Sequence, residues 1–328
     1  MAHELSTNEA GQVEAMFATH VKPWHGLGEM VDGAQTPRTA LTLAHLDWLV
    51  RKVPLTLPNG AVVPDKMATI RADSEKYLGT VGTDWTPVQN VEQAEFIEAL
   101  VGTGHAVVEC VGALKEGRRT FWTCKLPGNL IVTPGDEIER YMILANGHDG
   151  GMAFRAFWSP IRVVCQNTLN AALSVGRVQE GVTLYHTKNV KSRVEQAKRI
   201  LGVAGTYYDR LGETFHRMIQ REITGDEFKL YVDEVFPLPK EEGKKAGVTT
   251  QRAREAVTKN MRSGVGAKLA GHTAWGAYNA VTEYIDHQKS QKSAGDEEQR
   301  EKRFESILTG TGKALQQKAF DTALALVS

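Results

Sequence analysis

Basic and aromatic side chains alternate along two predicted β-hairpins, and this combination suits single-stranded nucleic acid. Phosphate groups need cations, and unpaired bases stack on aromatic rings. We therefore expect the basic residues to contact phosphates and the two tryptophans to stack on bases. The other interpretation of the pattern is a solvated charged face above a core of aromatic residues. The predicted surface consists of Lys115, Arg118, Arg119, Trp122, Lys125, Arg155, Trp158 and Arg162.

A second group of residues with chemical potential is Asn146-Gly147-His148-Asp149-Gly150, which lies between two predicted strands. His148 and Asp149 would form an acid/base or ligand pair at a hairpin tip, with Asn146 beside them. Asn, Asp and Gly are also the usual residues of a β-turn, so a structural turn is the alternative. Both interpretations stay open at this point.

Cys165 follows Pro160 near the start of a predicted helix. With His148 it would make a nucleophile pair, because a thiolate needs a neighbouring base or a helix N-terminus. No nucleophile signature surrounds Cys165, and a buried core cysteine is the simpler interpretation. The histidines are scattered without the spacing of a metal site. We therefore assign no catalytic residue and expect no metal and no cofactor.

The composition bounds these hypotheses. Of the 328 residues, 41% are hydrophobic and 24% are charged, which suffices for a large core and argues against global disorder. The 39 basic residues balance the 39 acidic ones, so phosphate affinity must come from a local patch. The three cysteines form no CxxC pair, which argues against a disulfide framework or a zinc site made of thiolates. Residues 1–11 contain no apolar signal segment, and no apolar run reaches the roughly 18 residues of a membrane span. We expect a cytoplasmic protein of a bacterial host cell.

Strands must position the predicted surface. Alternating apolar residues around the turn pair Asn59-Gly60 predict a first hairpin. The later strands have short connections, which predicts an antiparallel meander. Short helices are expected over 39–49 and from a cap at Asn90. The fold class is α+β, with an antiparallel meander packed with helices, then a helical hairpin and a helical C-terminal segment. The strands predicted after the first hairpin span residues 67–71, 77–81, 105–114, 120–126, 138–145 and 152–158.

The helical half begins with the clearest periodicity in the chain. From Val190 to Met218, apolar residues recur at alternating spacings of four and three, which is a heptad seam. Thr224 and Glu227 fit a capping box, so a second helix should begin there and pair with the first as a hairpin. We divide the chain into an α+β body over 1–187, a long helical hairpin over 188–239, and a linker-separated helical region over 240–328.

Five blocks are spread over nearly the whole chain: PWHGLG at 23–28, DWTPVQN at 84–90, the segment 144–150, PIRVVCQNTL at 160–169, and a tail block at 271–284. Together they resemble the signature blocks of the phage/plasmid-like protein family, whose conserved domain has no established function. Gly147 departs from the family, which has a serine at that place in the turn. The resemblance implies a mobile-element origin and no particular activity. The order of helix, antiparallel hairpins and basic helix is also similar to that of ring-forming single-strand annealing proteins, without a shared motif.

The sequence leaves three functional hypotheses open. The first is a DNA-metabolism protein that binds single-stranded DNA, and anneals it, as a homo-oligomer acting through the predicted surface. The second is an interaction module in which the seam over 190–218 binds a host protein, a phage protein or a second copy of the chain. The third is an enzyme in which His148, Asp149 and Cys165 converge.

Overall fold

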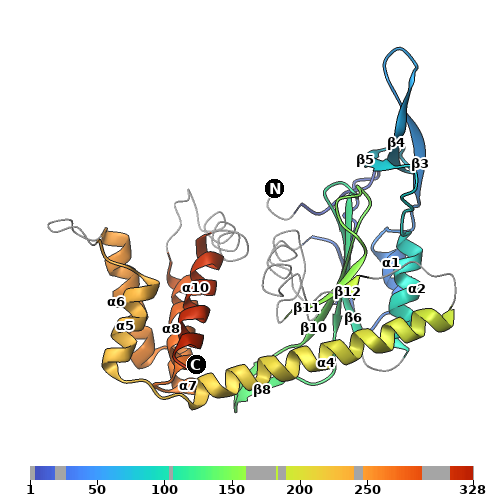
Figure 1. Ribbon diagram of the computed structural model, residues 1–328. Helices are drawn as coiled ribbons and strands as arrows, with labels where there is room; N and C mark the ends of the chain where they lie inside the picture. Colours follow the sequence, from blue (N-terminus) through green and yellow to red (C-terminus); the bar gives the residue numbers. More distant parts are fainter. Residues whose placement is uncertain are drawn as a thin grey trace. The chain divides into compact units, whose positions relative to one another are not determined.

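The computed structural model describes residues 4–18, 27–102, 106–159, 182–183, 190–239, 247–289 and 311–327. It has the expected α+β character, with antiparallel sheets on the N-terminal side and helices in the C-terminal half (Figure 1). The chain folds into two compact units. The first unit comprises Met1–Gly128 and Glu139–Tyr207, and the second comprises Asn129–Ile138 and Tyr208–Ser328. The segment 208–239, which the sequence assigned to a separate hairpin, thus shares a unit with the C-terminal region.

A seven-stranded sheet forms the centre of the first unit. Its strands are β1 (Ala15–Ala18), β2 (Glu29–Val31), β6 (Val107–Leu114), β7 (Arg119–Lys125), β10 (Tyr141–Gly147), β11 (Arg155–Ser159) and β12 (Val182–Thr183). The order β6-β7-β10-β11 is antiparallel throughout, which confirms the predicted meander. β1 extends the sheet antiparallel to β6, and β2 runs parallel to β1.

Helices cover the middle of this sheet. Every residue of β10 is buried, as expected for a strand with both faces covered. α2 (Asn90–Val101) packs on one face, where its Gln93 Oε1 accepts hydrogen bonds from the Thr120 hydroxyl at 2.9 Å and from the Trp122 indole at 3.3 Å. α1 (Pro37–Leu43) ends earlier than the predicted helix over 39–49, because His45 adopts a left-handed φ of 55°.

A three-stranded antiparallel sheet consists of β3 (Val50–Thr56), β4 (Val62–Arg71) and β5 (Tyr77–Gly82). The predicted turn at Asn59-Gly60 joins the first two strands, and Gly60 takes the φ of +83° that favours glycine. β5 pairs with β4 only from Lys66 onward. The far part of the hairpin therefore has two strands, and Figure 1 shows it as a projecting ribbon.

The heptad segment forms one long helix, α4 (Val190–Gln220), as the periodicity predicts. Residues of α4 up to Tyr207 belong to the first unit and those from Tyr208 to the second. Of the seam members whose burial is described, Ala204, Tyr208, Phe215 and Met218 are buried, and Leu201 and Leu211 are half-buried. This part of the seam is therefore covered within the chain itself.

The second unit is mainly helical. It contains a small hairpin, β8 (Leu130–Thr133) and β9 (Asp136–Ile138), which the sequence analysis did not anticipate. Its core includes Phe215 of α4, whose ring lies 4.6 Å from that of Trp275. None of the described helices is both long enough and apolar enough to cross a membrane. The remaining elements are α5 (Gly225–Val235), α6 (Val248–Ser263), α7 (Val265–Ala270), α8 (Ala274–Glu283), the π-helical turn η2 (Tyr284–Gln288) and α10 (Thr311–Ala325).

α5 begins at the predicted capping box. The Glu227 N–H donates to the Thr224 hydroxyl at 3.2 Å, and the Thr224 N–H donates to Glu227 Oε2 at 2.8 Å. Along its length α5 packs against α10 rather than along α4. The capping signal thus located the start of α5. The helix that α5 packs against lies about ninety residues away in sequence, as the hydrogen bond from the Tyr231 hydroxyl to the Ala319 carbonyl shows.

Candidate nucleic-acid interface

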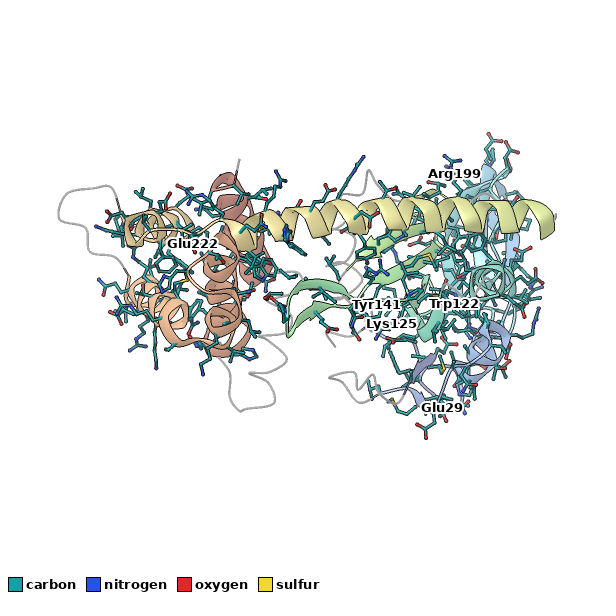
Figure 2. The ribbon with its side chains drawn as sticks, turned by 90° about the horizontal axis from the view of Figure 1, so that it is seen from below. Glu29, Trp122, Lys125, Tyr141, Arg199 and Glu222 are labelled. Carbon is teal, nitrogen blue, oxygen red and sulfur yellow. The ribbon has the colours of Figure 1, made fainter. Side chains whose placement is uncertain are left out.

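The structure corrects the role predicted for the two tryptophans. Trp122 and Trp158 are each only 1% exposed, so neither ring offers a face to a base. Trp122, which is labelled in Figure 2, donates through its indole to Gln93. The Trp158 ring packs 6.3 Å from that of Tyr207. Both rings belong to the core, because strand alternation turns them toward helices instead of solvent. We therefore remove both from the candidate interface.

Carboxylates oppose three of the cations that the sequence placed on the same surface. Each of these carboxylates comes from another part of the chain, so sequence spacing did not reveal the pairing. Exposed charges that are already opposed in this way contribute little to the local potential. The pairs, with their N–O distances, are Lys115 and Glu4 (3.8 Å), Arg119 and Asp149 (3.9 Å), and Lys125 and Glu139 (2.5 Å).

The remaining cations of the predicted surface add little. Arg118 and Arg155 are half-buried, and the Arg118 carbonyl accepts a hydrogen bond from the His148 N–H at 2.8 Å. Arg162, like Cys165 of the enzyme hypothesis, lies outside the described residues. The first unit therefore supports the predicted interface weakly, since its rings are buried and most of its cations are countered.

The turn from Asn146 to Asp149 is mostly buried rather than exposed at a hairpin tip. His148 is fully buried, and its Nε2 lies 2.9 Å from Asn90 Oδ1. The Asn90 amide donates to the Leu46 carbonyl at 3.1 Å, so its oxygen is left to accept. His148 therefore carries its proton on Nε2 and donates to Asn90. In this place the imidazole acts as a neutral structural donor.

Burial also sets the protonation state of this histidine. Desolvation by burial, together with the nearby charge of Arg71, lowers the pKa of His148 to about 3. A ring that stays neutral and has no access to water does not exchange protons with a substrate near neutral pH. The structure thus favours the structural interpretation of the turn over the acid/base interpretation.

A buried ion pair lies beside the turn. Arg71 of β4 contacts Glu14 at 2.7 Å, and the Arg71 side chain is 4% exposed while that of Glu14 is fully buried. The Arg71 guanidinium also lies 4.3 Å from the centre of the Trp48 ring, which contacts the His148 ring edge-on at 5.4 Å. The Thr69 hydroxyl donates to the His148 carbonyl at 2.9 Å. These contacts, here called the polar anchor, join the small sheet to the large one.

The second unit carries a cationic surface that the sequence analysis missed. On α6, Arg254, Thr258 and Arg262 repeat every four residues, which places them on one helical face. Two cavities, of about 330 and 410 Å³, share these three residues. Residues of α5 and α6 line the first cavity, and residues of α6 line the second. We call the two cavities together the basic groove. Its other lining residues with functional groups are Phe228, Lys229, Glu255, Lys259, Ser263 and His272.

The cations of the groove differ in their availability. Arg254 forms an ion pair with Asp233 and donates to the Phe236 carbonyl at 2.8 Å, so its guanidinium is engaged within the protein. Lys229, Lys259 and Arg262 are exposed, and none of them pairs with a carboxylate in the part of the chain that the structure describes. The charged residues of α6 are mostly basic, which is visible in the sequence. The sequence does not indicate that α5 faces α6.

The described residues contain no group of three or more His, Cys, Asp or Glu side chains placed to hold a metal ion.

A family model with the description "Domain of unknown function (DUF932)" matches residues 77–308, well over half of the chain. No curated protein and no solved structure matches the chain.

Proposed function

This chain belongs to the DUF932 family, a domain of unknown function, and from that starting point we propose that it binds single-stranded DNA through the basic groove of the second unit. One observation carries the proposal. Three exposed cations, Lys229, Lys259 and Arg262, line adjoining cavities together with the half-buried ring of Phe228. Cations that follow a backbone and a ring that stacks on a base are the two elements of single-strand binding.

The size of the groove favours one strand over two. The cavity that contains Phe228 has a volume of about 330 Å³, in the range of small-ligand pockets. In a duplex the bases are stacked and paired inside the helix, so the ring of Phe228 would not reach them. An unpaired nucleotide turns its base outward and brings its phosphate to the cations. A single strand therefore uses both features of the groove, and a duplex uses only the charge.

The biological setting extends the same proposal. The resemblance of blocks such as residues 84–90 and 160–169 to phage/plasmid-like proteins supports a role in the DNA metabolism of a mobile element. Annealing by a homo-oligomer is the activity we propose within that setting. The partner-binding alternative through the seam over 190–218 gains no support, because Phe215 and Met218 of that seam are buried in the core of the second unit.

The test is fluorescence anisotropy of a labelled oligothymidylate, titrated with full-length protein at several salt concentrations. We expect salt-sensitive binding that an unlabelled duplex competes for poorly. In the Lys259→Gln/Arg262→Gln variant, the slope of log affinity against log salt should fall by about 1.4, since each lost phosphate contact removes about 0.7. The matched control is Arg252→Gln/Lys268→Gln, which removes the same charge from exposed positions outside both cavities.

Two results would count against the proposal. Equal weakening in both double variants would show a diffuse charge effect with no role for the groove. The absence of binding at low salt would remove the proposal altogether. Circular dichroism and thermal melting of each variant would show that the fold is intact.

A further inference from the structure

We infer that the cavity between α5 and α6 binds a nucleoside monophosphate, with the base against Phe228 and the phosphate among Lys229, Arg262 and His272. The inference rests on the proposed function, because it names the chemical group that this end of the basic groove takes. The group has two sources, namely a free mononucleotide or the 5′-phosphorylated end of a strand.

One wall of the cavity is apolar and rigid. Val232 and Met261 are buried and line it from α5 and α6. The Phe228 ring stacks on that of Tyr231 at 6.2 Å, and Tyr231 is itself 1% exposed. The Tyr231 hydroxyl donates to the Ala319 carbonyl at 3.2 Å, so the supporting ring is fixed in turn. A ring held from behind loses little conformational freedom when a base stacks on it, which favours binding.

The opposite side of the cavity is cationic. Its described lining contains Lys229, Arg254, Arg262 and His272, and none of the described lining residues is acidic. The charge of Arg254 is already opposed by Asp233, which leaves Lys229 and Arg262 as the cations for a ligand. A phosphate monoester carries about two negative charges near neutral pH, against one for an internal phosphodiester. The local excess of positive charge therefore suits a terminal phosphate best.

The backbone reinforces this preference. The cavity includes Gly225, the first residue of α5, and open space surrounds the position where a Cβ would stand. The capping box already occupies the Glu227 N–H, so the N–H groups of Gly225 and Asp226 are those left for an anion at this end of the helix. His272 is held beside this end of α5, because the Ile223 N–H donates to the His272 carbonyl at 2.9 Å. The helix terminus and the cations thus act on the same space.

Arg254 positions the walls without contacting the ligand. Its guanidinium links α6 to the end of α5 through Asp233 and through the carbonyl of Phe236. This clasp sets the separation of the two helices and hence the width of the cavity. The cavity is less open than the one along α6. It therefore suits the end of a strand better than its interior, because an internal nucleotide needs an exit on each side.

Isothermal titration calorimetry of the full-length protein with deoxyadenosine monophosphate tests the pocket directly. Deoxyadenosine and inorganic phosphate serve as half-ligands, and each should bind at least about tenfold more weakly than the whole nucleotide. Arg262→Gln should weaken nucleotide binding about tenfold or more, as expected when a charged hydrogen bond is lost. Phe228→Leu should weaken binding of the nucleotide but leave binding of inorganic phosphate unchanged. Arg252→Gln, on the same helix but outside the cavity, is the control and should have no effect.

A second experiment separates the two sources of the ligand. Anisotropy compares oligothymidylates with a 5′-phosphate and with a 5′-hydroxyl, and a preference for the phosphorylated strand that Arg262→Gln abolishes identifies the strand end. Nucleotide binding without any binding of oligonucleotides would leave the pocket in place and overturn the proposed function. Strand binding that ignores the 5′-phosphate, with no nucleotide binding, would overturn the pocket and leave the proposed function in place. Equal affinity for nucleotide and inorganic phosphate would overturn the base contact.

Discussion

His148 Nε2 lies 2.9 Å from Asn90 Oδ1, and this contact ties the turn after β10 to the first residue of α2. Both side chains are buried, at 0% and 1% exposure. The two residues are 58 positions apart in sequence, so the contact exists only in the folded chain. Two polar residues that the sequence places at the surface therefore form one hydrogen bond in the interior.

The protonation of His148 gives a first prediction. Because burial holds the pKa of His148 at about 3, its NMR resonance should not titrate between pH 8 and pH 5, whereas an exposed histidine shifts with a midpoint near the ordinary value of about 6.5. His148→Gln identifies the resonance by its disappearance. A normal titration curve for this ring would contradict the buried, neutral state.

The same histidine makes stability depend on pH. The unfolded chain binds a proton at a pKa of about 6.5, while the folded chain resists protonation until pH falls to about 3. The stabilising contribution is therefore complete above pH 6.5 and is lost progressively as pH falls from 6.5 toward 3, by at most about 1.4 kcal/mol per pH unit. Urea unfolding across this range should show the slope in the native protein. The slope should be smaller by that amount in His148→Gln, and parallel curves would contradict the prediction.

The buried pair of Glu14 and Arg71 gives a second kind of test. Burial raises the pKa of Glu14, and the hydrogen bond and charge of Arg71 oppose that rise. Arg71→Met leaves the buried Glu14 without its cation and should reduce the free energy of unfolding by about 3–5 kcal/mol. Glu14→Gln should cost less, because Arg71 stays paired with Asp73 at 2.7 Å. The double variant should lose much less than the sum, as measured by a urea-unfolding double-mutant cycle. Additive losses would show that the two side chains do not interact in solution.

Two glycines of β5 form a matched pair. A Cβ on Gly79 would lie 2.6 Å from the Asp149 Cα, whereas a Cβ on Gly82 would meet nothing within 4 Å. Gly79→Ala should therefore destabilise the protein by about 1–3 kcal/mol through overpacking against the backbone. Gly82→Ala should leave stability within about 1 kcal/mol, on the stabilising side. Thermal melts of the two variants check this, and equal effects would contradict the close approach of β5 to the turn.

Arg254 tests the clasp between α5 and α6. Arg254→Lys keeps the charge but loses the planar fork that reaches both Asp233 and the Phe236 carbonyl. We expect a loss of about 1.5–3 kcal/mol in unfolding free energy together with weaker nucleotide binding, because the cavity walls are no longer held. Arg252→Lys on the exposed side of the same helix is the control. Unchanged binding in Arg254→Lys would show that the cavity does not depend on the clasp.

Local signals in the sequence determined much of the architecture. The Asn59-Gly60 pair located a hairpin, the Thr224 and Glu227 pair located a helix start, and the heptad spacing located α4. Each of these depends on residues within a few positions of one another, where backbone sterics and side-chain caps act directly. The short strands β8 and β9 escaped notice because they have few residues, although Pro134-Gly135 between them is a turn signal.

Tertiary structure alone decided which of the polar and aromatic residues face solvent. Trp122 and Trp158 read as stacking platforms in sequence, but the helices that cover the sheet bury them. Arg119 and Lys125 read as free cations, but Asp149 and Glu139 approach them from distant segments. The basic groove exists because α5 and α6 lie side by side, and neither helix carries that information by itself. Secondary structure follows from short-range interactions that a sequence window contains, whereas burial, ion pairing and cavities depend on long-range packing that no window contains.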